Sequence, residues 1–143
     1  MLIVTMLRSK GDFVATLPPD ASVRALLDTL AEHRIGAVVV STDGSTIVGI
    51  VSERDVVRRL RTVGSELLDE PVSAIMTTEV VTCTPQSTVE DLMLMMTEQR
   101  IRHVPVVVDG GLAGIVSIGD VVKTRIYELE RERDDLVGYI GTR

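Results

Sequence analysis

Residues 49–55 read GIVSERD, and residues 114–120 read GIVSIGD. Seven of nine positions are identical when the comparison includes the Val-Val pair that follows each stretch. The two stretches differ only between the Ser and the Asp, where Glu53-Arg54 stands in the first and Ile118-Gly119 in the second. A repeated stretch of this kind indicates a duplicated structural unit.

The repeat extends well beyond these signatures. At an offset of 66 residues, positions 14–40 align with positions 80–106, and ten of 27 pairs are identical. Loss of one residue in the next loop then brings the two GIV stretches into line. Each unit reads as β-α-β-β-α, because β-branched runs alternate with stretches whose apolar residues are three and four positions apart. The strands are expected at 14–17, 37–40 and 47–51 in the first unit, and at 80–83, 104–108 and 112–116 in the second.

A unit of about 50 residues buries too little apolar surface to be stable alone. We therefore expect an α/β (α+β) module in which the two units pack with pseudo-two-fold symmetry, followed by a C-terminal helix that ends near Gly138. The expected organisation is a lead-in over 1–13, a first repeat over 14–62, a linker over 63–79, a second repeat over 80–124 and the C-terminal helix over 125–143.

Composition excludes several classes of protein. The net charge of −6 and the scarcity of aromatic residues argue against binding to nucleic acid, which needs basic surface and stacking faces. No apolar run is long enough to span a membrane, and the first residues do not follow the pattern of a signal peptide. With a single cysteine, Cys83, the chain is typical of the reducing cytoplasm.

Catalysis is also not indicated. The two histidines, His33 and His103, and the single cysteine form no recognisable nucleophile-base set, no metal-ligand spacing and no phosphate loop. We therefore expect no enzyme activity, no catalytic residues and no metal.

Two tandem β-α-β-β-α units that each end in G-h-V-S-x-x-D, with h apolar, resemble a CBS-domain pair, or Bateman module. The resemblance covers residues 14 to about 123, and the whole chain is similar to small stand-alone bacterial proteins of this type. In that family the cleft between the repeats binds adenosyl ligands: AMP, ADP, ATP, NAD(H) or S-adenosylmethionine. The resemblance implies a regulatory sensor of such a ligand, which signals by a change in conformation or assembly, and it implies a homodimer that acts on a further regulated protein.

The S-x-x-D turns allow two interpretations. Ser with an acid three residues later is a helix cap in many proteins. A carboxylate held at a helix N-terminus can instead accept hydrogen bonds from both hydroxyls of a ribose. In the family the matching Asp binds ribose and the matching Ser contacts ribose or phosphate. The resemblance therefore implies a ligand role for Ser52 and Asp55, and for Ser117 and Asp120.

The remaining candidates lie near strand starts. Arg102 and His103 match family positions that reach phosphates, although a surface arginine and a structural histidine are the simpler interpretations. The first repeat has Gly36 and Ala37 there. Further candidates are Pro105 and Ile118 near the base, Thr82 and Thr84 lining an adenine pocket, and Arg54 and Lys10 near phosphates.

These residues suggest two unequal sites. The better site is expected to hold ribose on Asp120, with the base near Thr82 and Ile118, and the weaker site is expected around Ser52 and Asp55. The alternative function is a protein-interaction module whose ligand site is vestigial.

Overall fold

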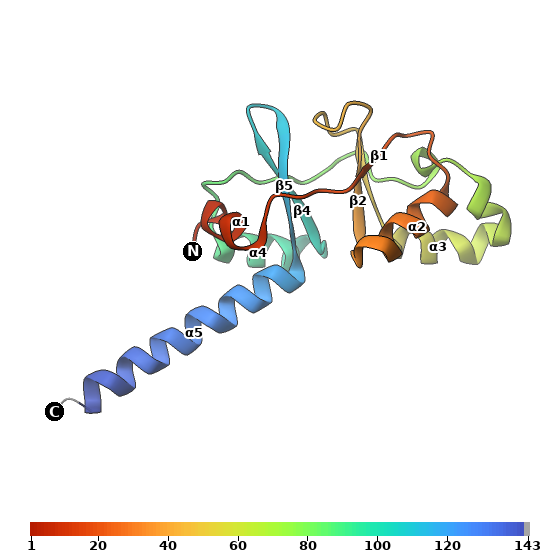
Figure 1. Cartoon of the computed structure of the whole chain (residues 1–143). Helices are drawn as coiled ribbons and strands as arrows, with labels where there is room; N and C mark the ends of the chain where they lie inside the picture. Colours follow the sequence, from red (N-terminus) through yellow and green to blue (C-terminus); the bar gives the residue numbers. More distant parts are fainter. Residues whose placement is uncertain (142–143) are drawn as a thin grey trace.

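The computed structural model describes residues 1–141 and has the duplicated α+β architecture, followed by a C-terminal helix, that the sequence predicts (Figure 1). The first half consists of α1 (Ile3–Lys10), β1 (Thr16–Leu17), α2 (Val23–His33), β2 (Ala37–Val40), β3 (Gly49–Ser52) and α3 (Glu53–Val63). Two 3-10 turns, η1 (Gly64–Asp69) and η2 (Val72–Ala74), connect it to α4 (Val89–Gln99), β4 (His103–Val108), β5 (Gly111–Ser117) and α5 (Ile118–Gly141).

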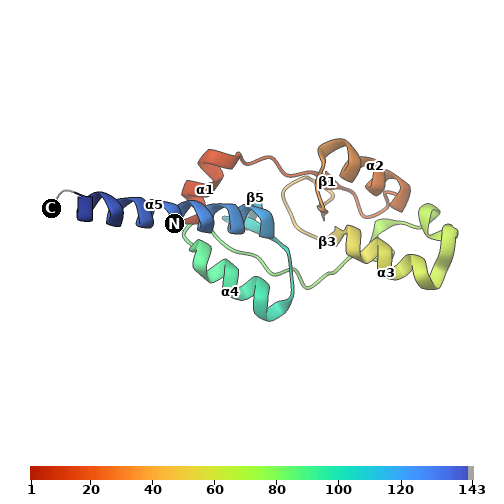
Figure 2. The ribbon, with the colours of Figure 1, turned by 90° about the horizontal axis from the view of Figure 1, so that it is seen from below.

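The two repeats place their strands in equivalent registers. In the first, β2 lies between a parallel β1 and an antiparallel β3, with Ala37 opposite Ser52. In the second, β4 and β5 are antiparallel, with His103 opposite Ser117. The two small sheets lie side by side in the middle of the molecule, with α1, α4 and α5 on the side of β4 and β5, and α2 and α3 on the side of the first sheet (Figure 2). Both S-x-x-D turns therefore leave their sheets at corresponding points.

The first strand of the second repeat differs from our expectation. In place of a strand over 80–83, the structure has a single bridge between Cys83 and Val106. In the first repeat, the backbone N–H of Val39 donates to the carbonyl of Ala15, at 3.2 Å. The position that matches Val39 is Pro105, which has no N–H to donate. The ladder therefore cannot propagate.

The segment that precedes each repeat packs into the hydrophobic core of the other repeat. Ile3 and Met6 of α1 are buried in the core of the second repeat, and Leu67 and Val72 of the linker are buried in the core of the first. Backbone hydrogen bonds support the exchange: Ile3 N–H donates to the carbonyl of Ser87 at 2.9 Å, and Val72 N–H to that of Ala21 at 2.8 Å. The first residues are thus part of the second repeat's core, and they tie the two halves together.

The two signature glycines lie under these exchanged segments. A Cβ on Gly49 would be 2.7 Å from Sδ of Met76 and 2.9 Å from the carbonyl oxygen of Thr77. A Cβ on Gly114 would be 3.0 Å from a methyl group of Leu7 in α1. The glycine in each GIVS stretch therefore allows the segment that precedes the other repeat to lie directly on the strand.

Replacement of Gly49 by alanine is expected to destabilise the protein by about 1–3 kcal/mol, because the new methyl group overlaps the backbone of Thr77. Chemical denaturation measures this free energy. Gly138→Ala is the control: nothing lies within 4 Å of its Cβ position on exposed helix, so it should be neutral or stabilising by up to about 1 kcal/mol. Equal stability of Gly49→Ala and wild type would contradict the close approach.

Helix α5 is longer than expected. It runs unbroken from Ile118 through Gly138 to Gly141, and its C-terminal half projects away from the two repeats (Figure 1). Our expectation that it ends near Gly138 is wrong, since a glycine on an exposed helix weakens it without terminating it. The last two positions of the expected 125–143 segment lie outside the described residues. Among residues 1–141, no helix has the length and hydropathy of a transmembrane span.

Candidate functional site

The two S-x-x-D turns are built in the same way. Each strand ends at its Ser, and the helix begins at the next residue. The first helical N–H donates across the repeat, from Glu53 to the carbonyl of Gly36 at 3.0 Å and from Ile118 to that of Arg102 at 2.8 Å. Each turn is therefore attached to the start of the neighbouring strand, where the sequence placed its other candidate residues.

Both aspartates cap their helices. Oδ2 of Asp55 accepts from the backbone N–H of Ser52 at 2.8 Å and from its hydroxyl at 3.1 Å. Asp120 accepts from Ser117 N–H at 2.9 Å, while the Asp120 N–H donates to the Ser117 hydroxyl at 3.2 Å. Within the described chain Oδ1 of Asp55 takes no hydrogen bond, so one carboxylate oxygen can accept from a ligand while the other caps α3.

Asp120 has a further partner that Asp55 lacks. Lys10, at the end of α1, donates to the Asp120 carboxylate and to the carbonyl of Ile115, the latter at 2.6 Å. Burial raises the pKa of Asp120, but hydrogen bonds from Lys10 and Ser117 outweigh it and keep the pKa below its usual value. At the 66-residue offset Lys10 corresponds to Met76, which cannot form such a pair. The carboxylate of Asp120 is therefore paired with a cation, whereas that of Asp55 has no such partner among residues 1–141.

A cleft between the repeats opens beside Asp55. Its cavity has a volume of about 170 Å³ and is lined by residues from both repeats and from the linker. The first repeat contributes the S-x-x-D turn and the start of β2, the linker contributes residues 77 and 79, and the second repeat contributes residues 80 and 81 and the start of β4. The lining residues are Gly36, Ala37, Ile50, Ser52, Glu53, Arg54, Asp55, Arg58, Thr77, Glu79, Val80, Val81, Arg100, Ile101, Arg102 and His103.

Four arginines make the cleft suitable for an anion. They are Arg54 and Arg58 of α3, and Arg100 and Arg102 before β4. None of the four forms an ion pair with another residue in the described part of the chain. Guanidinium groups bind phosphate oxygens through two parallel hydrogen bonds. The cleft therefore combines a carboxylate suited to ribose with cations suited to phosphate.

His103 lies where the two repeats meet. A Cβ on Gly36 would be 3.2 Å from the His103 ring and 3.4 Å from the Glu53 carboxylate, so the absence of a side chain at Gly36 makes room for both. Burial lowers the pKa of His103, with a smaller opposing effect from Glu53. The imidazole is therefore neutral at pH 7, and its contribution to binding an anion would be a hydrogen bond.

The structure brings together five of the residues singled out from the sequence and separates the others from them. Ser52, Arg54, Asp55, Arg102 and His103 all line the cleft. Ser117 and Asp120 belong to the second turn described above, and Lys10 at the end of α1 pairs with Asp120. Thr82 is exposed before the Cys83 bridge, Thr84 caps the turn that precedes α4, and the Pro105 carbonyl accepts from Cys83 N–H. Ile118 lies on the outer face of α5.

Sequence reasoning missed Arg58, Arg100, the linker residues Thr77 and Glu79, and Val80 and Val81 at the start of the second repeat. For the linker a signal existed: the 66-residue offset places Met76-Thr77 over Lys10-Gly11. For the two arginines it did not, because a helix surface and a helix end are ordinary places for arginine. No three His, Cys, Asp or Glu side chains gather as a metal site in residues 1–141.

Comparison with protein families gives a clear result. The model of the CBS domain matches twice, over residues 11–62 and 72–127. The chain belongs to the CBS-domain family. It carries two CBS repeats, and the matches contain both S-x-x-D turns.

Relatives and solved structures agree. The CBS domain-containing protein CBSX3, mitochondrial, of Arabidopsis thaliana is 38% identical over 125 residues, which are 85% of this chain and 61% of that protein. This chain therefore spans about three fifths of that relative's length. The crystal structure of the CBS-domain containing protein ATU1752 from Agrobacterium tumefaciens is 47% identical, covers 87% of this chain and 99% of its own, and has a TM-score of 0.84. A CBS domain protein from Pyrobaculum aerophilum, PAE2072, was solved complexed with AMP; it is 30% identical over 84% of this chain and 89% of its own, with a TM-score of 0.74.

Proposed function

We propose that this CBS-domain pair is a regulatory module that binds an adenosyl ligand, AMP, ADP, ATP or NAD(H), in the cleft beside Asp55. The observation that carries the proposal is the composition of that cleft, in which the S-x-x-D turn of one repeat faces arginines of the other. The AMP complex of the Pyrobaculum relative supports the choice of an adenosyl ligand.

Each part of the ligand has a matching part of the cleft. The ribose hydroxyls would donate to Asp55, whose Oδ1 accepts no other bond within the described chain. The phosphates would lie toward Arg54 and Arg102. The base would lie along Val80 and Val81 at the start of the second repeat, which supply apolar surface. This assignment moves the better site from Asp120 to Asp55, because Lys10 already neutralises Asp120.

The same geometry suggests how binding is signalled. The cavity of about 170 Å³ is smaller than the roughly 300–1,000 Å³ of typical ligand clefts. A whole nucleotide would therefore have to widen the gap between the repeats. A ligand that binds the wider arrangement more tightly shifts the population toward it. We propose that this change of packing is the signal.

We also propose an assembly state, a partner and a cellular location for the module. The chain would act as a homodimer, without enzymatic activity of its own and without a metal, on a regulated protein in the cytoplasm. A single cysteine cannot form a disulfide within the chain, which supports a cytoplasmic location. The sequence shows no nucleophile-base set, which supports a regulatory role.

The alternative is a protein-interaction module with a vestigial ligand site, and the Lys10–Asp120 pair favours it for the second turn. Thermal unfolding separates the two functions. A ligand at 100 times its Kd stabilises the native state by about 2.7 kcal/mol, so AMP, ADP, ATP or NAD(H) should raise the Tm by about 5 °C or more. An unchanged Tm with all four would favour the alternative.

A further inference from the structure

Helix α5 carries an exposed apolar stripe that the nucleotide site does not use. We propose that two copies of this chain pair antiparallel along this stripe. The proposal deepens the proposed homodimer by naming its surface and orientation, and it holds or fails independently of nucleotide binding.

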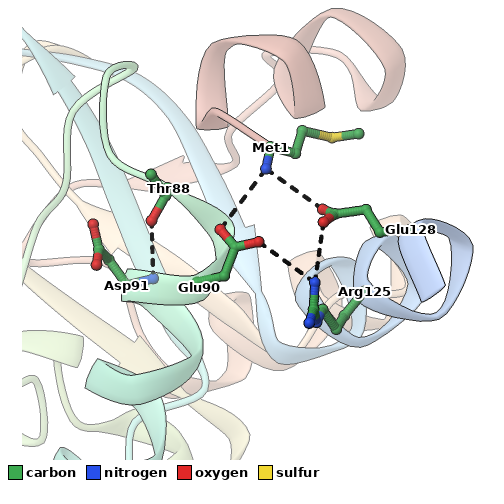
Figure 3. Close-up of polar contacts among 6 residues, drawn as sticks. All are labelled: Met1, Thr88, Glu90, Asp91, Arg125 and Glu128. Carbon is green, nitrogen blue, oxygen red and sulfur yellow. Dashed lines mark hydrogen bonds and ion pairs between the residues drawn. The ribbon is translucent and has the colours of Figure 1, made fainter. Parts of the chain in front are cut away.

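One face of α5 is already committed to its own chain. Val121 is fully buried, and Arg125 pairs with Glu90 of α4 at 3.6 Å and with Glu128 at 3.2 Å (Figure 3). These contacts hold the first turns of α5 against α4. The rotation of the helix is therefore fixed, and so is the direction in which its other face points.

The stripe lies on that other face. Its apolar residues recur every three or four positions, which is the spacing found in a two-stranded coiled coil. Arg133 is the single charged residue in this series. Five apolar residues form the stripe, and each is about half exposed or more: Val122 48%, Ile126 52%, Leu129 48%, Leu136 63% and Ile140 69%.

Arg133 decides the orientation. In a parallel pair it would face Arg133 of the second copy inside the seam, which places two like charges in contact. In an antiparallel pair centred between Tyr127 and Glu128, Arg133 faces Val122, and Ile126 faces Leu129. The two central Ile126–Leu129 layers are then wholly apolar, and in the Val122–Arg133 layers the guanidinium can reach solvent past the smaller valine.

Flanking charges favour the same arrangement. Basic Lys123 and Arg125 flank the N-terminal half of the stripe, and acidic Glu130 and Glu132 flank its C-terminal half. The antiparallel register places Lys123 beside Glu130 of the second copy, twice by symmetry, whereas Arg125, which would lie near Glu132, already pairs with Glu90 and Glu128 of its own chain. Lys123, Glu130 and Glu132 form no ion pair within residues 1–141, so they are available.

An open hollow receives the end of the partner helix. It has a volume of about 450 Å³ and is lined by Ile118, Gly119, Val122, Lys123 and Ile126. The register places Leu136 of the second copy opposite Gly119. At Gly119 the nearest atom to an added Cβ, the Ser117 hydroxyl, is 3.6 Å away, so this side is uncrowded. The Ile118-Gly119 pair, which replaces Glu53-Arg54 in the second signature, thus provides an apolar surface against which Leu136 of the second copy can pack.

Cysteine crosslinking tests the orientation in the full chain. In the antiparallel pair, Cys at position 122 of one copy lies opposite position 133 of the other copy. Two copies of the same variant therefore hold their cysteines 11 positions apart, about 16 Å along the helix, whereas a mixture of Val122→Cys and Arg133→Cys brings the two cysteines face to face. We expect a disulfide-linked heterodimer, identified by its mass, only when the two variants are mixed. Wild type is the control, since Cys83 is buried. Crosslinking of Val122→Cys alone would show a parallel pair, and no crosslink in the mixture would show a different surface; either overturns the proposal.

Charge reversal provides a second measurement. Lys123→Glu should weaken the dimer about fivefold or more in sedimentation, because it replaces two attractions by two repulsions, and added Glu130→Lys should restore it. Arg59→Glu, an equivalent reversal on exposed α3, should have no effect. Equal dimer dissociation constants for Lys123→Glu and Arg59→Glu, or a monomeric wild type, would overturn the proposal even if the chain binds nucleotide.

Discussion

Replacement of Asp55 by alanine is expected to lower the affinity for AMP by about 30-fold or more in calorimetric titration. The ribose would lose hydrogen bonds to an ionised carboxylate, and such bonds contribute roughly 1.5–3 kcal/mol each. Asp55 also caps α3, so the variant should lose about 1 kcal/mol of stability. Circular dichroism at the titration temperature checks that it is folded.

Asp120→Ala is the matched control, because it removes the equivalent cap from α5. Its affinity for AMP should stay within about twofold of wild type, since Asp120 does not line the cleft and already pairs with Lys10. The opposite pattern, in which Asp120→Ala loses binding and Asp55→Ala does not, would return the main site to the second turn.

Replacement of Lys10 by methionine is expected to create a second nucleotide site and raise the stoichiometry from one AMP to two per chain. Methionine is the residue at the corresponding position, Met76, which lies against Gly49 at the start of β3. Lys10 and Ser117 both bond Oδ2 of Asp120, so the change removes the neutralising cation beside the carboxylate, which can then accept the hydroxyls of a ribose as an unpaired anion.

The competing interpretation gives the opposite result for this variant. If Lys10 contacts the phosphates of a bound ligand, as the family resemblance suggested, Lys10→Met should weaken binding without adding a site. Lys10→Arg separates charge from shape: under our account it keeps one site, because an arginine can still pair with Asp120. One AMP per chain with a reduced affinity in Lys10→Met would contradict the account.

The duplication and its fold could be predicted from the sequence because both are written in local patterns. The two GIVS stretches, the apolar spacing of α2 and α4 and the β-branched strands recur at a nearly constant offset. The missing strand before Cys83 was also predictable in principle, from Pro105 at the position of Val39, but only once the parallel pairing partner was known.

Other features depend on contacts between distant segments, which no local pattern encodes. The first residues read as a lead-in, yet Ile3 and Met6 are in the core of the second repeat. Lys10 read as a phosphate ligand and in the structure pairs with Asp120, 110 positions away. That the Glu-Arg to Ile-Gly exchange makes the two sites unequal stays a prediction, whereas the difference that the structure shows between the two carboxylates comes from the packing of α1, which pairs Lys10 with Asp120.

The most direct test of the account is a crystal structure of the protein with AMP. We expect density for one nucleotide per chain in the cleft between the repeats, with the ribose hydroxyls within 2.5–3.0 Å of the Asp55 carboxylate, the usual range for such bonds, and the phosphate on arginines of the cleft. The Lys10–Asp120 pair should remain closed. A nucleotide bound at Asp120 with Lys10 displaced, and none at Asp55, would contradict the central claim.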